Sequence, residues 1–179
     1  MESLSGFTST SLGYFLAFLL PGSTGFLAAT FYFRQPHQLL LRATSGGSNF
    51  GLVVGCFLAA FTIGLLLIPF RDRMYGERFL GRGSSYPPNE KYGNLTKPEV
   101  LVAYRMLIDD NYRYFQFWAG MSLCLPFLAI GVFRDQWHTF GGLQKWFAVG
   151  ASVVIELAAV GSARQEKRDF CESVGQVLA

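Results

Sequence analysis

The sequence predicts an all-α membrane protein with four transmembrane helices, both termini in the cytoplasm, and a capped cytoplasmic helix that leads into the third span. Three observations predict this fold class. Hydrophobic residues make up 51% of the 179 residues and charged residues only 15%, against roughly 25% charged residues in an average soluble domain. Four apolar runs approach the ~20 residues that a helix needs to cross a bilayer. Lys and Arg are also distributed unequally among the segments between these runs.

The whole chain, residues 1–179, forms one expected domain. Its spans cover about residues 12–33, 50–70, 115–133 and 146–163, with a loop at 71–114 and a tail at 164–179. A soluble helical protein with four such runs would have almost no polar surface, so we disfavour that alternative. The first ten residues contain no Lys or Arg, unlike the positively charged start of a secretory signal. We therefore expect the first span to stay in the mature protein.

Prolines interrupt two of the expected spans. Pro21 and Gly22 lie in the first span and Pro126 lies in the third, and proline removes a backbone hydrogen bond from a helix. A kink is the simpler interpretation, because neighbouring helices and Ser or Thr side chains can satisfy the freed carbonyls. A broken helix that marks a ligand or ion site is the alternative.

Small residues form a stripe along the second span. Gly51, Gly55 and Ala59 are each four positions apart and therefore lie on one helix face. Such a face lets another helix backbone approach closely. The stripe predicts a helix contact, either inside the four-helix unit or, as the alternative, between subunits.

A capping box marks the start of a helix in the long loop. Thr96 and Glu99 are three residues apart, and Pro98 falls in the first turn, which is typical of a helix N-terminus with Thr96 as its N-cap. We expect this helix to continue into the third span. The tail has apolar residues at helical spacing, Phe170, Val174 and Val177. It is expected to fold back on the protein, to lie on the membrane surface or to bind a partner.

Positive charge predicts the orientation in the membrane. Eleven of the fifteen Lys and Arg residues fall on the side that holds both termini and the 71–114 loop, and four fall on the other side. Segments rich in Lys and Arg stay in the cytoplasm, so both termini are expected there. Aromatic residues close to several span ends, among them Phe33, Trp137 and Trp146, fit the interfacial aromatic belt.

Glu156 is the only charged residue in the expected fourth span. It lies about 10–15 Å from each end of the span, at a depth where a charge costs at least roughly 2.5–3.5 kcal/mol. Ser152 lies one turn before it, and Thr62 and Ser122 lie at a similar depth in other spans. We predict that these four residues form an intramembrane polar site. Three interpretations stay open: a neutral carboxylic acid hydrogen-bonded between helices, a carboxylate that lines a pore or accepts protons, and a buried ion pair.

Residues that form common catalytic and cofactor sites are missing from the sequence. The chain has two histidines, both between expected spans, and three scattered cysteines. It has no HExxH, CxxC, Ser–His–Asp set or glycine-rich phosphate loop. We therefore predict no catalytic residues, no cofactor and no metal. A net charge of +3 is too small to indicate a nucleic-acid-binding surface.

Three stretches resemble a group of uncharacterised small bacterial proteins with four transmembrane helices. They are FLLPGSTGFLA at 18–28, DDNYRYFQFWAGM at 109–121 and the basic SARQEKRDF after the fourth span. The group has an L-P-G turn in the first helix and a Y-R-Y-x-Q-F-Y/W stretch before the third. The three stretches span 33 of the 179 residues. The resemblance implies a bacterial inner-membrane location and transfers no functional residue. It marks a structural or contact motif of Tyr112, Arg113, Tyr114, Gln116 and Phe117.

These features favour a non-enzymatic accessory or structural subunit of a larger bacterial inner-membrane assembly. The expected partners are the lipid bilayer and other membrane protein subunits or copies of the same chain, and not nucleic acid. The alternative is a homo-oligomeric membrane channel or effector, for example in an anti-phage defence system, with Glu156 at the pore or proton site. A membrane enzyme or lipid-binding protein that uses the basic region at 71–82 is a third interpretation, although anchoring of the loop to anionic lipid explains that region more simply.

Overall fold

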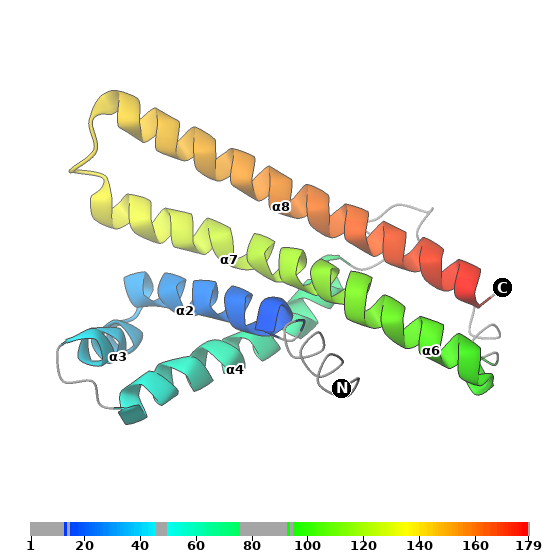
Figure 1. Ribbon diagram of the computed structural model, residues 1–179. Coiled ribbons are helices and arrows are strands. Elements are labelled where there is room, and N and C mark those ends of the chain that lie inside the picture. The colour runs from blue at the N-terminus through cyan, green and yellow to red at the C-terminus, as the bar shows by residue number, and fades with distance from the viewer. Residues whose placement is uncertain (1–12, 14, 46–49, 76–92, 94, 179) are drawn as a thin grey trace, which may run out of the picture.

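The computed structural model describes residues 13, 15–45, 50–75, 93 and 95–178 of the chain (Figure 1). Over these residues the fold consists of helices without any strand, which confirms the expected all-α class. Two five-residue π-helical turns, η1 (Phe15–Leu19) and η3 (Ile108–Tyr112), precede α2 and α7. The α-helices are α2 (Leu20–Tyr32), α3 (Arg34–Thr44), α4 (Phe50–Met74), α6 (Pro98–Leu107), α7 (Arg113–Gln136) and α8 (Gly142–Val177).

Three of these helices, α4, α7 and α8, are long and apolar enough to cross a membrane. The chain is therefore a helical membrane protein. α4 contains the expected second span and extends it to Met74, and α7 and α8 extend the third and fourth spans at both ends. The expected first span corresponds to η1 and α2, where the apolar helix Ala17–Tyr32 is shorter. Residues 76–92 and 94 of the expected long loop lie outside the described residues.

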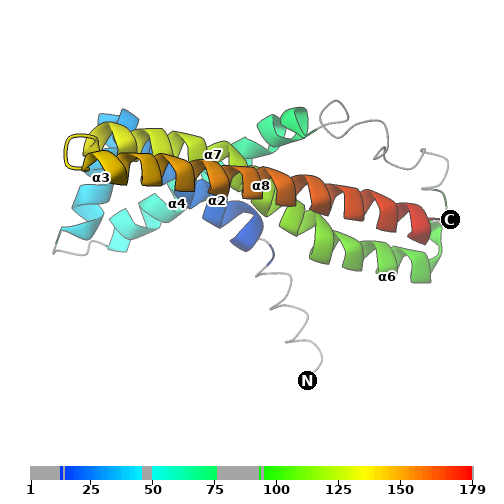
Figure 2. The ribbon, with the colours of Figure 1, turned by 90° about the horizontal axis from the view of Figure 1, so that it is seen from above.

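The helices form a row in which α2 packs between α4 and α7, while α8 packs against the far side of α7 (Figure 1). α3 lies across the end of the row where α2 ends and α4 begins. At the opposite end, α6 and η3 continue α7 past the ends of α2 and α4, beside the C-terminal half of α8 (Figure 2). A helical bundle thus continues at one end into a two-helix arm, formed by residues 98–112 and 164–178.

Glycines bring the backbones of α2 and α4 into contact. A Cβ atom built at Gly22 would overlap the carbonyl oxygen of Ala60 and lie 2.8 Å from the backbone nitrogen of Gly64. A Cβ atom built at Gly64 would overlap the carbonyl oxygen of Phe18. Small residues permit such close crossings in membranes, where van der Waals packing is a main source of helix association. The glycine of the Pro21-Gly22 pair therefore serves helix packing.

The interruption expected at Pro21 takes the form of the π-helical turn η1, which ends two residues before it. Proline has no N–H, so a carbonyl in the preceding turn loses its helical donor. A wider turn is a common adjustment at such a position. Thr24 adds a side-chain hydrogen bond, because its hydroxyl donates to the carbonyl oxygen of Leu20 at 3.0 Å.

The helix expected after the capping box begins later than predicted. α6 starts at Pro98 with Lys97 as its N-cap residue and without a side-chain cap, so the prediction of Thr96 as the N-cap is wrong. The hydroxyl of Thr96 instead donates to the carbonyl oxygen of Gly93 at 3.1 Å. The residue that precedes a proline disfavours the helical conformation. Lys97, which precedes Pro98, is accordingly extended. This extended residue places Thr96 outside the first turn of the helix. The expected continuation of this helix into α7, through η3, is present.

The segment between the first two spans contains a helix that the sequence analysis does not predict. α3 has only 11 residues, too few to cross a bilayer. Leu39 and Leu40 pack against the buried apolar cluster of α2 and α4, whereas Arg34 and Arg42 are exposed. Such an amphipathic helix is suited to lie along a membrane surface.

The C-terminal part of α8 belongs to the arm. A helix of 36 residues is about 54 Å long, which exceeds the ~30 Å hydrocarbon layer of a bilayer. Beyond the span, Phe170, Cys171 and Val174 of α8 and its C-cap residue Leu178 form a buried cluster against α6 and η3. The tail thus folds back on the protein, which is the first of its three predicted arrangements.

Candidate functional site

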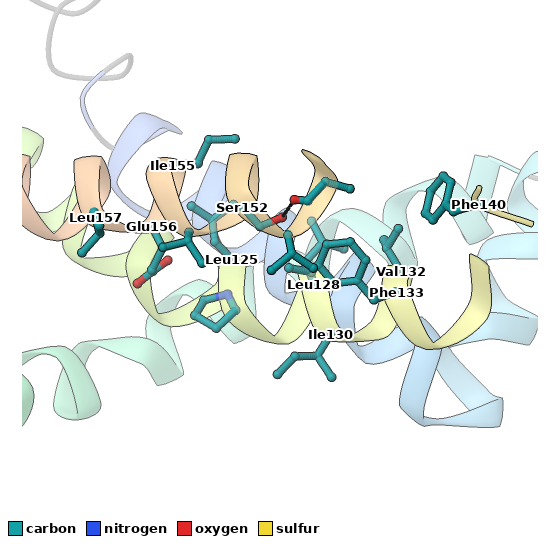
Figure 3. Close-up of a pocket in the computed structure, with 15 residues that line it drawn as sticks. Leu125, Leu128, Ile130, Val132, Phe133, Phe140, Ser152, Ile155, Glu156 and Leu157 are labelled. Carbon is teal, nitrogen blue, oxygen red and sulfur yellow. Dashed lines mark hydrogen bonds between the residues drawn. The ribbon is translucent and has the colours of Figure 1, made fainter. Parts of the chain in front are cut away.

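Glu156 lies on α8, and its side chain points toward α7 (Figure 3). It lines a groove of about 540 Å³ between the two helices. Its Oε2 atom is buried and has no hydrogen-bond partner within the described residues. Apart from Glu156 and Ser152 the groove is lined by apolar side chains, such as Leu125 and Pro126 of α7 and Val153 of α8.

Pro126 gives the facing wall of this groove an unusual backbone group. Because proline has no N–H, the carbonyl of Ser122, one turn earlier, loses its ordinary helical donor. Ser122 itself does not line the groove, but it lies one helical turn from Pro126. A neutral carboxylic acid at Glu156 would carry an O–H donor. The neutral, hydrogen-bonded acid, the pore or proton carboxylate and the ion pair all stay predictions, and the buried Oε2 atom has no hydrogen-bond partner among the described residues.

The structure brings together only part of the predicted polar site. Ser152 lines the same groove as Glu156, and its hydroxyl donates to the carbonyl oxygen of Ala148 at 2.9 Å. Thr62 lies on an exposed face of α4, where its hydroxyl donates to the carbonyl oxygen of Leu58 at 2.8 Å. Ser122 is buried and is absent from the lining of the groove. The polar site of the groove therefore consists of Glu156 and Ser152.

Ser122 belongs to a second polar cluster, which surrounds Phe115 near the arm. Ser122 and Tyr75 form a buried hydrogen bond between their hydroxyl groups, and Lys167 donates to the carbonyl oxygen of Tyr75. Phe115 is 2% exposed. Two cations flank its ring, with Arg71 Cζ 5.8 Å and Lys167 Nζ 5.6 Å from the ring centroid. Cation–π contacts of this kind stabilise desolvated cations.

Electrostatic interactions connect this cluster with Glu156. Burial raises the pKa of the Tyr75 phenol, and the hydrogen bond with Ser122 lowers that pKa. An ionised Glu156 would raise the pKa of Tyr75, and the charge of Arg164 lowers that pKa, so both groups lie within electrostatic reach of the phenol. Sequence reasoning missed this cluster, because only the basic residues near span ends gave a signal, and they were assigned to the membrane surface.

The predicted small-residue stripe lies largely on an open face of α4. Gly51 is exposed, and a Cβ atom built at Gly55 meets no atom of the described chain within 4 Å. Ala59 packs against the buried cluster of α2 and α4. The tight internal crossing of α4 uses Ala60 and Gly64 instead. Within the described residues, the face of Gly55 is thus open.

The predicted contact motif divides between the core and the surface. Arg113 is buried, and Tyr112 packs against the C-terminal part of α8. Gln116 and Phe117 are half-buried on the first turns of α7, and Tyr114 is exposed. The inner residues of the motif therefore join the arm to the bundle, and Tyr114 is the member that faces outward.

The described residues contain no group of three His, Cys, Asp or Glu side chains that could hold a metal ion. His37 and His138 line different cavities. The three cysteines, Cys56, Cys124 and Cys171, are free thiols.

Comparison with known proteins gives no assignment. No family model matches the chain, and no curated protein or solved structure matches it. The resemblance to small bacterial four-span proteins stays a prediction that rests on three short motifs.

Proposed function

We propose that the chain is a non-enzymatic subunit of a larger protein assembly in a bacterial inner membrane. In this proposal four helices cross the membrane, η1 and α2 form the first of them, and both termini face the cytoplasm. The arm then extends into the cytoplasm. The Lys and Arg distribution supports the orientation, and the motif resemblance supports the bacterial location.

The outer face of α8 carries this proposal. α8 packs against α7 along its span, and its opposite face is exposed. Gly150 and Gly161 lie on that exposed face, and Cβ atoms built at either position meet no atom of the described chain within 4 Å. Glycine adds no apolar area toward lipid, whereas small residues are enriched where membrane helices contact each other. This surface supports a second neighbour for α8, contributed by another chain in the proposed assembly.

Native mass spectrometry of the chain, gently extracted from its own membrane, tests the proposal. We expect complexes in which other membrane proteins are bound to the 19.9 kDa chain. Gly150→Leu should weaken these complexes, because its side chain fills the space that a partner helix needs. Val53→Phe adds bulk to an exposed position of α4 that points away from the face of Gly55, and it serves as the control. Recovery of the bare chain alone, while other membrane complexes survive the extraction, would contradict a subunit role.

Glu156 and Ser152 favour a second candidate function, a homo-oligomeric membrane channel or effector. Both side chains line the α7–α8 groove, so further copies packed beside α8 would enclose two polar groups at the depth of the bilayer. Intramembrane carboxyl groups are typical of ion and proton pathways.

Ion flux through liposomes that contain the purified chain separates the two candidates. A channel should appear at whole multiples of the 19.9 kDa mass, and Glu156→Gln should abolish its flux. Thr62 lies outside the groove, so Thr62→Val should leave the flux unchanged. A subunit should tolerate Glu156→Gln with its partner binding intact.

A further inference from the structure

A polar cavity of about 480 Å³ lies where α2 ends, α3 begins and α7 ends. We call it the end pocket. Its ionisable side chains come from two helices, with Arg34 and His37 on α3 and Arg134 and Asp135 on α7. Phe31, Tyr32 and Phe33 complete much of its wall.

Positive charge dominates the end pocket. Two guanidinium groups and one imidazole share it with a single carboxylate. Arg34, Arg134 and Asp135 form no ion pair within 4.0 Å in the part of the chain that the structure describes. The carboxylate of Asp135 instead accepts a hydrogen bond from the side chain of Gln136 at 2.8 Å. The pocket therefore suits an anion with several oxygen atoms.

Local backbone geometry adds to this positive potential. Phe33 is extended, with φ −124° and ψ 132°, and it separates α2 from α3. Arg34 is the first residue of α3, so the N-terminus of α3 borders the pocket. A helix N-terminus carries a partial positive charge.

An apolar groove adjoins the end pocket and shares Tyr32 and Phe33 with it. The groove has a volume of about 490 Å³ and lies between α2, α4 and α7, where Ala29, Leu67 and Phe127 are among its lining residues. A cationic pocket next to an apolar groove is complementary to an amphiphile with an anionic head and a hydrocarbon chain. Tyr32 is exposed, and exposed tyrosine is typical of the depth of lipid head groups.

We propose that the end pocket binds the phosphodiester of a glycerophospholipid and that one acyl chain of this lipid lies in the groove between α2, α4 and α7. Guanidinium groups bind phosphate oxygens through paired N–H donors, and Arg34 and Arg134 supply two of them from different helices. A free phosphate ion would use the pocket but not the groove, so the groove distinguishes the two sources of the anion.

Native mass spectrometry of protein released from nanodiscs of phosphatidylcholine and phosphatidylglycerol measures the retained lipid. The unaltered chain should keep one phosphatidylglycerol molecule. The double variant Arg34→Gln/Arg134→Gln should lower the retained fraction at least about tenfold, because each charge-assisted hydrogen bond contributes roughly a factor of ten. Both arginines are exposed, so their replacement leaves helix packing intact and a loss reports binding.

The matched control is Arg42→Gln/Lys145→Gln. It removes the same charge from residues that do not line the end pocket, and it should retain the lipid as the unaltered chain does. Equal retention by both double variants would overturn the proposal.

A second variant addresses the groove. Ala29→Phe fills the groove without changing charge and should also reduce the retained lipid. Retention equal to that of the unaltered chain would overturn the placement of the acyl chain. Displacement of the lipid by an equal concentration of glycerol phosphate or inorganic phosphate would show a site for a free anion and would overturn the lipid assignment.

Discussion

Lys167 of α8 donates a hydrogen bond to the main-chain carbonyl oxygen of Tyr75, which directly follows α4. The phenol of Tyr75 is hydrogen-bonded to Ser122 in α7. Tyr75 therefore joins α4, α7 and α8 at the start of the arm, although α4 and α8 lie on opposite sides of the row (Figure 1). This residue and the buried amine of Lys167 thus connect three helices that are far apart in the sequence.

Lys167→Ala should destabilise the fold. Lys167 is buried, and its removal deletes a charge-assisted hydrogen bond, worth about 2 kcal/mol, together with a cation–π contact to Phe115. We expect the melting temperature in detergent, followed by tryptophan fluorescence, to fall by roughly 4–8 °C. The neighbouring Arg168 is exposed, so Arg168→Ala should leave the melting temperature nearly unchanged. Equal effects of the two substitutions would contradict the role of Lys167.

Gly22→Ala and Gly64→Ala should each weaken the crossing of α2 and α4. Each added methyl group would overlap backbone atoms of the facing helix, and backbone moves aside less readily than a side chain. Overpacking of this kind costs about 1–3 kcal/mol. Gly55→Ala is the control, because its methyl group would meet no described atom within 4 Å and alanine favours helix. The melting temperatures of all three variants are measured in the same detergent. A lower melting temperature for Gly55→Ala than for Gly22→Ala would contradict the role of Gly22 in the crossing of α2 and α4.

Glu156→Gln should leave stability nearly unchanged, whereas Glu156→Ala should lower it by about 1–3 kcal/mol. The physical reason is that glutamine keeps a donor in the groove between α7 and α8, and alanine does not. Equilibrium unfolding in mixed micelles measures both variants. Large and equal losses for the two would favour an ionised carboxylate in an ion pair.

Pro126→Ala tests whether Glu156 interacts with the carbonyl of Ser122. This substitution gives residue 126 an N–H donor for the carbonyl of Ser122. In the Pro126→Ala background, the cost of Glu156→Ala should therefore fall by at least about 1 kcal/mol. Additive effects in this double-mutant cycle would show that the Ser122 carbonyl and Glu156 do not interact.

The long apolar helices were predictable from the sequence, because uninterrupted hydrophobic runs have few alternatives in a bilayer. Residues 50–70 and 115–133 lie inside α4 and α7. Helix ends were less predictable. α4 and α8 continue through basic residues such as Arg71 and Lys167, since these side chains are buried against Phe115 and do not end the helix at the membrane surface.

The composition of the polar sites was less predictable than the helices. Equal depth in the membrane places Glu156, Ser122 and Thr62 at one level, but it does not fix which way each helix turns. The structure turns Thr62 to an exposed face and pairs Ser122 with Tyr75. Tyr75 follows the expected second span in a segment that sequence patterns assign to a loop, so no local signal indicates this contact.

Val174→Asp should release the arm without unfolding the bundle. Val174 is fully buried between α8 and α6, and an unpaired carboxylate there costs several kcal/mol. Hydrogen exchange measured by mass spectrometry should become at least about a hundredfold faster in residues 98–107 and 170–177. Exchange in the apolar part of α7 should stay slow. Gln176→Asp introduces the same charge at an exposed neighbour and should leave both regions protected. If Val174→Asp instead accelerates exchange equally throughout α7, the arm and the bundle unfold as one cooperative unit.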